Sequence, residues 1–121
     1  MIIDIGNAAA GQLRCYVNDT NITVLEPDTG RNDGNWHFVA CVLDRGANKL
    51  SLYTDGTLEA SVSASALAGL DLNAVSTLDF PLNPYLAGFL GGVRMYATAL
   101  TVSEIRSLYA EGAAKYNVAV K

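Results

Sequence analysis

The segment Lys49–Ser63 constrains the fold more than any other stretch of the chain. Two strand-like runs, 49–54 and 57–63, are separated only by Asp55-Gly56. Asp-Gly is a preferred pair for a two-residue type I′ turn, because both turn residues of that type need positive φ angles. The sequence therefore predicts an antiparallel β-hairpin near the centre of the chain.

Other strand signals lie at short spacing on both sides of this hairpin. Residues 12–17 alternate between apolar and polar side chains, and 22–25 is a short β-branched run. Residues 36–43 are nearly all apolar, which suits a strand covered on both faces. We also expect strands at 75–80, 87–96 and 116–120. Short strands joined by tight turns are typical of an antiparallel all-β domain.

One helix is predicted near the C-terminal end. Thr101 and Glu104 have the spacing of a capping box, in which the two side chains satisfy backbone N–H groups at a helix start. Gly112 is placed to end the helix in the left-handed conformation. The expected helix is about ten residues long, within the usual range for globular proteins.

Composition indicates one domain over residues 1–121 and excludes several classes of partner. Half of the residues are apolar, which is enough for a core, while only 17% are charged. A low charge content hints that a partner covers part of the surface. The net charge is −4 and the eight basic residues are scattered, so we expect no nucleic-acid binding. We also expect no signal peptide and no membrane span.

The two cysteines, Cys15 and Cys41, each lie in an apolar, strand-like run. Buried free thiols are the plainer interpretation, because free cysteine behaves as a small apolar residue. A disulfide between neighbouring strands is the alternative. No CxxC pair occurs, so the sequence does not indicate a zinc site.

Four stretches carry a likeness to a known family. Residues 35–44 read NWHFVACVLD and are followed by LYTDG at 52–56. Residues 88–96 read GFLGGVRMY and are followed by ALTVSEI at 99–105. In this order the motifs resemble those of the laminin-G-like, or concanavalin A-like, jelly roll.

The resemblance implies an all-β fold, an antiparallel two-sheet jelly-roll sandwich with one short C-terminal helix. Trp36 is expected to begin a central strand and to fill a large core volume. Family members are usually longer, with strands before the point at which this chain begins. We therefore expect a shortened sandwich that borrows cover from another chain.

Nothing in the sequence forms a catalytic set. Glucanases of this fold class carry paired acids in an E-x-D-x-x-E pattern, and the four glutamates here do not form it. His37 is the only histidine, and a structural role in the sheet is more plausible for it than contact with a ligand. We therefore expect no enzyme activity and no required cofactor.

The resemblance makes calcium and sugars the candidate ligands. Loop oxygens that could bind calcium belong to Asp28, Asn32, Asp33 and Asp55. Each of them also has a turn role that explains it, so the metal site stays unassigned. Aromatic rings that could stack on a sugar belong to Tyr16, Tyr53 and Tyr85. Tyr53 and Tyr85 are the ligand residues that we predict.

The sequence favours a non-catalytic structural or assembly protein that acts through protein–protein contacts. A bacteriophage virion component, such as a capsid decoration (cement) protein, is the specific prediction, with the virion as its location. A homo-oligomer, with a trimer as the guess, or a capsid lattice would supply the missing cover. The alternative is a lectin-like module that binds carbohydrate, with calcium as a candidate metal.

Overall fold

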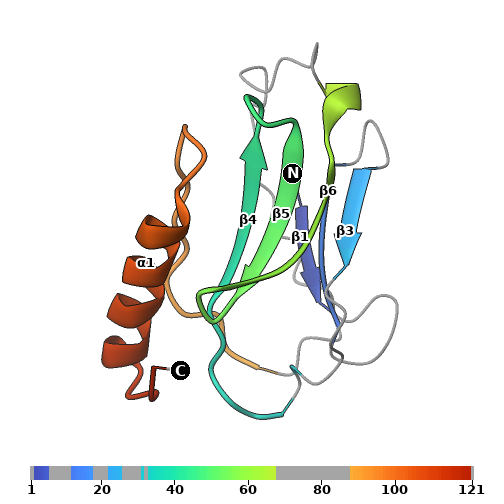
Figure 1. Cartoon of the computed structure of the whole chain (residues 1–121). Helices are drawn as coiled ribbons and strands as arrows, with labels where there is room; N and C mark the ends of the chain where they lie inside the picture. Colours follow the sequence, from blue (N-terminus) through green and yellow to red (C-terminus); the bar gives the residue numbers. More distant parts are fainter. Residues whose placement is uncertain are drawn as a thin grey trace.

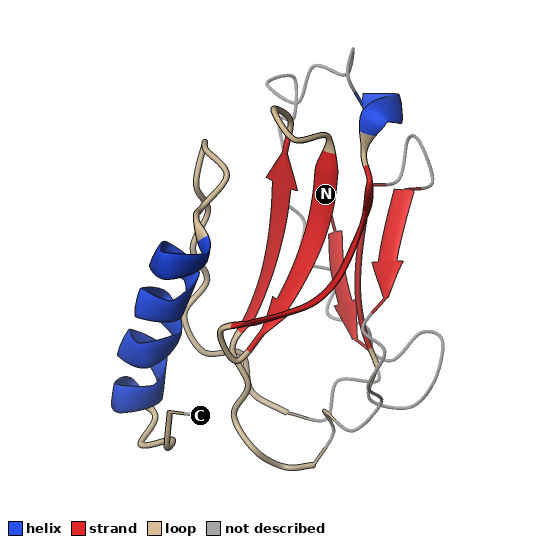
Figure 2. Cartoon of the chain, in the orientation of Figure 1, coloured by secondary structure: helices blue, strands red, loops and turns tan. Residues whose placement is uncertain are grey.

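The computed structural model describes residues 2–5, 12–17, 22–25, 31, 33–67 and 88–120. Its strands form two three-stranded antiparallel sheets (Figure 1). The first sheet contains, in spatial order, β1 (Ile2–Ile5), β2 (Leu13–Val17) and β3 (Ile22–Leu25). The second contains β4 (Val39–Asp44), β5 (Lys49–Thr54) and β6 (Thr57–Ser63). Helical segments of the described chain are the 3-10 helix η2 (Ser65–Leu67) and the α-helix α1 (Val102–Lys115) (Figure 2).

The β5–β6 hairpin has the strand bounds that the sequence predicts. Asp55 has a φ angle of 51° and Gly56 one of 77°, the pair of left-handed conformations that a type I′ turn requires. Thr54 pairs with Thr57 across this turn, which sets the register of the hairpin, and β4 pairs along the other side of β5. The turn prediction is confirmed.

Side chains from both sheets form the core between them. Leu13 and Cys15 of β2 meet Leu50 and Leu52 of β5, and all four are almost fully buried. The sequence left two alternatives open for the cysteines, and the structure contains the disulfide. It joins Cys15 to Cys41 of β4, whose Cα atoms are 6.1 Å apart, and so links the two sheets covalently.

The outer face of the second sheet is covered by α1. Val42 of β4 and Tyr53 of β5 form a buried cluster with Ile105 of the helix. Figure 1 shows α1 on one side of β4 and β5, and the first sheet on the other side. Because β4 has apolar neighbours on both faces, its sequence is nearly all apolar, as predicted.

The start of α1 has the predicted capping box. The Thr101 side-chain oxygen accepts a hydrogen bond from the Glu104 backbone N–H at 3.3 Å. The Glu104 carboxylate accepts one from the Thr101 backbone N–H at 2.7 Å. Two N–H groups that would otherwise lack a partner at the helix start are thereby satisfied.

The predicted end of α1 at Gly112 is wrong, because the helix runs 14 residues to Lys115. The left-handed residue is Asn117, with a φ angle of 56°. The Val118 N–H donates to the Ala113 carbonyl at 2.8 Å, which closes the helix end. Burial of Ala113 against the rest of the domain favours the extra turn over the termination that glycine would allow.

Trp36 does not begin the central strand, and it is not a core residue. The strand begins at Val39, which pairs with Thr54, the last residue of β5 before the turn. Residues 36–38 therefore precede the paired part of β4, and Phe38 accepts a hydrogen bond from the Asp55 backbone N–H in the turn. Trp36 is 38% exposed, and its ring stacks on that of Tyr116 with centroids 4.4 Å apart.

Two further predicted strands are absent from the described chain. Residues 88–96 lie outside both sheets, so the predicted strand at 87–96 is wrong for the part that is described. Residues 116–117 form a turn and 118–120 are irregular, so the strand predicted at 116–120 is also wrong. Gly91, in the segment 88–96, lies so close to the Tyr116 side chain that a Cβ there would overlap its hydroxyl oxygen.

The fold class is mostly β with antiparallel sheets and one short α-helix. Within the described ranges each sheet is a simple meander, so the connections that define a jelly roll stay a prediction. The strand predicted at 75–80 and the prolines Pro81 and Pro84 lie outside the described residues. No helix in the described part is long and apolar enough to span a bilayer.

Candidate functional site

Residues 88–96, called the ribbon below, run beside α1 in the opposite direction. Gly91 lies against Tyr116, just past the C-terminal end of the helix. Arg94 contacts Glu111, which lies more than one helical turn before Tyr116 in the chain. Tyr96 lines a pocket together with Leu108. Figure 1 shows this segment, coloured orange, next to α1. These contacts tie the ribbon to the helix.

The pair Arg94–Glu111 ties the middle of the ribbon to the helix. Nη1 of Arg94 donates to Oε2 of Glu111 at 2.9 Å, and Nη2 donates to Oε1. The bond to Arg94 lowers the pKa of Glu111, and the bond to Glu111 raises the pKa of Arg94. Both side chains are more than half exposed, so solvent weakens the attraction and this pair contributes little to stability.

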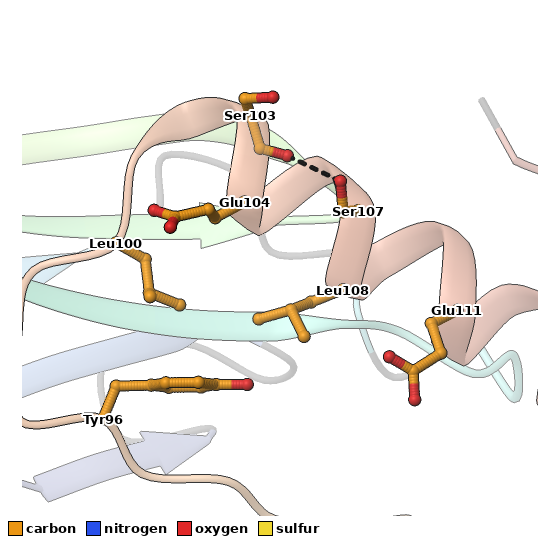
Figure 3. Close-up of a pocket in the computed structure, with 7 residues that line it drawn as sticks. All are labelled: Tyr96, Leu100, Ser103, Glu104, Ser107, Leu108 and Glu111. Carbon is orange, nitrogen blue, oxygen red and sulfur yellow. Dashed lines mark hydrogen bonds between the residues drawn. The ribbon is translucent and has the colours of Figure 1, made fainter.

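A pocket of about 280 Å³ lies between the end of the ribbon and α1. Its lining residues are Tyr96, Leu100, Ser103, Glu104, Ser107, Leu108 and Glu111. Figure 3 shows Tyr96, Leu100 and Leu108 around its apolar part, with the serines and glutamates along the helix. The Ser107 hydroxyl donates to the Ser103 carbonyl at 3.0 Å. Such a pocket suits an apolar group with a polar edge.

The two pocket carboxylates are poorly suited to acid–base catalysis. Hydrogen bonds from the Thr101 backbone N–H and hydroxyl lower the pKa of Glu104. Glu111 has its pKa lowered by Arg94. A general acid at neutral pH needs a raised pKa, and both groups are shifted in the other direction. Neither pocket carboxylate is therefore suited to act as a general acid at neutral pH.

Large apolar side chains of the ribbon are exposed to an unusual extent. The exposed fractions are 87% for Phe89, 61% for Leu90, 47% for Val93, 66% for Met95 and 48% for Tyr96. No backbone–backbone hydrogen bond joins the ribbon to another residue of the described ranges. A segment with exposed apolar side chains, whose backbone groups do not bond the backbone of the other described residues, is of the kind that pairs with a strand of another chain.

Of the two residues predicted to contact a ligand, the structure describes Tyr53. Tyr53 is buried at 8% exposure, in one cluster with Val42 and Ile105, so its ring has no open face for a sugar. Tyr85 lies outside the described residues, and so does the side chain of Tyr16. The exposed ring that borders a pocket is that of Tyr96, which the sequence did not single out.

Of the four residues considered as calcium ligands, the structure describes two. Asp28 and Asn32 lie outside the described residues. Asp33 and Asp55 do come close to each other in the fold, but both accept hydrogen bonds from groups at His37 and its neighbours. No three histidine, cysteine, aspartate or glutamate side chains of the described part form a group that could hold a metal ion. We assign no metal ligand.

The sequence patterns predicted neither the pocket nor the Arg94–Glu111 pair. One signal was present, because Glu104, Ser107, Leu108 and Glu111 are spaced as one stripe along a helix. The stripe alone does not reveal which segment lies over it. That contact depends on the ribbon lying beside α1, where a strand within a sheet was expected.

Two antiparallel sheets, a helix over the outer face of one of them and a surface ribbon define a small β-rich domain. The chain belongs to the concanavalin A-like lectin/glucanases superfamily, because the family Laminin_G_3 of that description matches residues 2–106. The family expectation from the sequence motifs is confirmed.

Comparison with individual proteins adds little to the family. Among solved structures the chain is similar to an S-layer domain-containing protein (residues 221–444) from Clostridium thermocellum, with 20% identity and a TM-score of 0.49. The match covers 82% of this chain and 52% of that chain, so this chain spans about half the length of that structure. None of the curated proteins matches the chain.

Proposed function

We propose that this chain is a non-catalytic assembly module that binds other protein chains through the ribbon. The observation that carries the proposal is the exposure of five large apolar side chains within residues 89–96. Isolated exposed apolar residues are ordinary, but a contiguous group on one segment marks an interaction surface. Its backbone groups add a means of pairing that helix or loop surfaces lack.

A second copy of the chain is the partner that the proposal favours first. The low charge content of 17% is compatible with a domain that covers part of its own surface by self-association. We propose a homo-oligomer, with a trimer as the guess for its size. The proposed setting is a bacteriophage virion, where the chain would act as a capsid decoration protein.

The test is the molar mass in solution, measured by size-exclusion chromatography with light scattering over a series of concentrations. We expect an oligomer for the unmodified chain and a monomer for the double variant Phe89→Ser/Met95→Ser. A matched control is Leu58→Ser/Val120→Ser, which removes apolar residues of 50% and 58% exposure elsewhere on the surface. Circular dichroism checks that each variant is folded. A monomer at every concentration, or equal effects of both double variants, would contradict the proposal.

Glycan binding is the second candidate, favoured by the pocket beside α1. Tyr96 is 48% exposed, and hydroxyl and carboxylate oxygens line the helix side of the pocket. An aromatic face next to polar groups is a combination that suits sugars. A glycan array probed with and without EDTA tests both the sugar and the calcium requirement. Binding that survives Tyr96→Ala would exclude this pocket as the site.

A further inference from the structure

His37 lies between two carboxylates, and both of its ring nitrogens are bonded. Nδ1 is 2.9 Å from Oδ2 of Asp55, and Nε2 is 3.1 Å from Oδ1 of Asp33. A neutral imidazole has one N–H and donates to one acceptor, whereas the protonated ring donates from both nitrogens. The arrangement around His37 therefore matches the protonated ring.

The two carboxylates are fixed by contacts of their own. Oδ1 of Asp55 accepts the Phe38 backbone N–H at 3.0 Å, and the Asp55 N–H donates to the Phe38 carbonyl at 2.9 Å. Asp33 accepts two hydrogen bonds from Asn35, at 2.8 Å from the backbone and 2.9 Å from the side chain. His37 thus lies between two acceptors that other hydrogen bonds hold in place, one on the hairpin turn and one on the loop before β4.

Burial and hydrogen bonding act on His37 in opposite directions. Burial by itself lowers the pKa of the ring, but the bonds to Asp55 and Asp33 outweigh it, so the pKa is raised above 6.5. The side chains of His37 and Asp55 are 11% and 10% exposed, whereas that of Asp33 is 42% exposed. The contact with Asp55 is therefore shielded from water and the contact with Asp33 is open to it.

The neighbours of this site connect it to α1. Trp36, next to His37, stacks on Tyr116 at the end of the helix. Gly56, next to Asp55, is so close to Tyr109 that a Cβ there would lie 3.0 Å from its ring. Two cations of α1 border these contacts: Arg106 lies beside Gly56, and Lys115 lies over the ring of Tyr116, 5.3 Å from its centroid. Among described groups, the two aspartates supply the charges that act on His37.

We propose that His37 is a pH-sensitive clamp that, when protonated, ties Asp33 at the start of the loop 33–38 to Asp55 of the β5–β6 turn and thereby fixes the stacking of Trp36 on Tyr116. On losing its proton the ring must give up one carboxylate. The shielded acceptor of Asp55 needs a donor more than the solvated Asp33 does, so the bond to Asp33 is the one released. The loop then loosens at Asp33 while the turn stays in place. This clamp is independent of the proposed assembly role.

The sign of the pH effect follows from the direction of the pKa shift. A histidine whose pKa is raised on folding contributes stability that is fully present below about 6.5 and is lost as the pH rises through the folded value. Asp33 behaves oppositely, since bonds from Asn35 and His37 lower its pKa, and its contribution is lost as the pH falls. The clamp is therefore closed in mildly acidic solution and opens as the pH rises.

The sequence makes this proposal simple to test, because the chain has one tryptophan and one histidine. Trp36 fluorescence, followed from about pH 5 to about pH 9, reports the stacking, and proton NMR of the His37 ring reports the titration. We expect one emission transition with a midpoint above 6.5 that coincides with the His37 titration. The variant His37→Gln should lose the transition.

Asp33→Asn provides a second test if His37→Gln does not fold. Removing this charge should lower the midpoint by about half a pH unit or more, since an opposite charge at this distance favours the protonated ring. Asp44→Asn is the matched control, because Asp44 ends β4 and pairs with Lys49, at the opposite end of β5 from Asp55, and should leave the midpoint unchanged. Trp36 emission that stays constant while His37 titrates, or an unchanged midpoint in Asp33→Asn, would overturn the clamp.

Discussion

The β5–β6 hairpin and the ribbon look alike in sequence but differ in the fold. Both are short, apolar-rich segments containing glycine, and both were predicted to be strands. In the hairpin Leu50 and Leu52 are fully buried, whereas Phe89 in the ribbon is 87% exposed. The difference lies in what fixes the register. Asp55-Gly56 forces one pairing, and no such turn signal acts within the ribbon.

This comparison teaches that an alternating apolar pattern predicts a strand reliably only where turn chemistry supports it. In the hairpin the turn places Thr54 opposite Thr57 and Tyr53 opposite Leu58, and the register then shifts by one residue between Tyr53 and Leu52. Gly91-Gly92 supply no side chains to interlock with a neighbouring strand. The ribbon is held instead by a Tyr116 contact and by one ion pair with α1.

The largest expected difference between the two regions is in unfolding free energy. Leu52→Ala should destabilise the fold by about 4 kcal/mol, because it leaves a cavity where both sheets meet. Leu90→Ala in the ribbon should cost no more than about 0.5 kcal/mol, since that side chain is 61% exposed. Urea unfolding followed by circular dichroism measures both. Similar losses for the two variants would mean that the ribbon is part of the core.

How much could be predicted from the sequence depends on whether the deciding contact is local. The hairpin and the Thr101–Glu104 cap depend on residues at most a few positions apart, and both were predicted in detail. The exposure of Trp36 depends on where β5 ends, and the end of α1 depends on the burial of Ala113. Those contacts join distant segments, which local patterns do not encode.

The same limit applies to the candidate site. The stripe of Glu104, Ser107, Leu108 and Glu111 is visible in the sequence, but its neighbour Tyr96 is not. His37 was assigned to a strand, although its ring in fact joins Asp33 to Asp55. Neither aspartate is recognisable as its partner without the hairpin turn and the preceding loop in place.

The next largest effect is expected for the disulfide that joins the two sheets. The sequence left open whether it forms. Cys15→Ala/Cys41→Ala should lower the unfolding free energy by about 3 kcal/mol, the loop-closure value for residues some 26 positions apart. Thermal unfolding with and without a reductant measures this loss. The unmodified chain should become as unstable as the variant when it is reduced, and the variant should not respond. If the reductant did not change the stability of the unmodified chain, the cysteines would be free thiols, which was the other alternative.

The smallest expected effect concerns the helix end, where sequence and structure disagree over one glycine. Gly112 lies inside α1, and a Cβ at this position would meet nothing within 4 Å, so Gly112→Ala should stabilise the protein by roughly 0.5–1 kcal/mol. Gly56→Ala is the matched control and should destabilise, because Gly56 has a φ angle of 77° and its Cβ would lie 3.0 Å from Tyr109. Chemical denaturation of both variants separates the two roles. If Gly112→Ala destabilised as well, Gly112 would be acting as the left-handed helix terminus that the sequence predicted, and α1 would end one turn earlier.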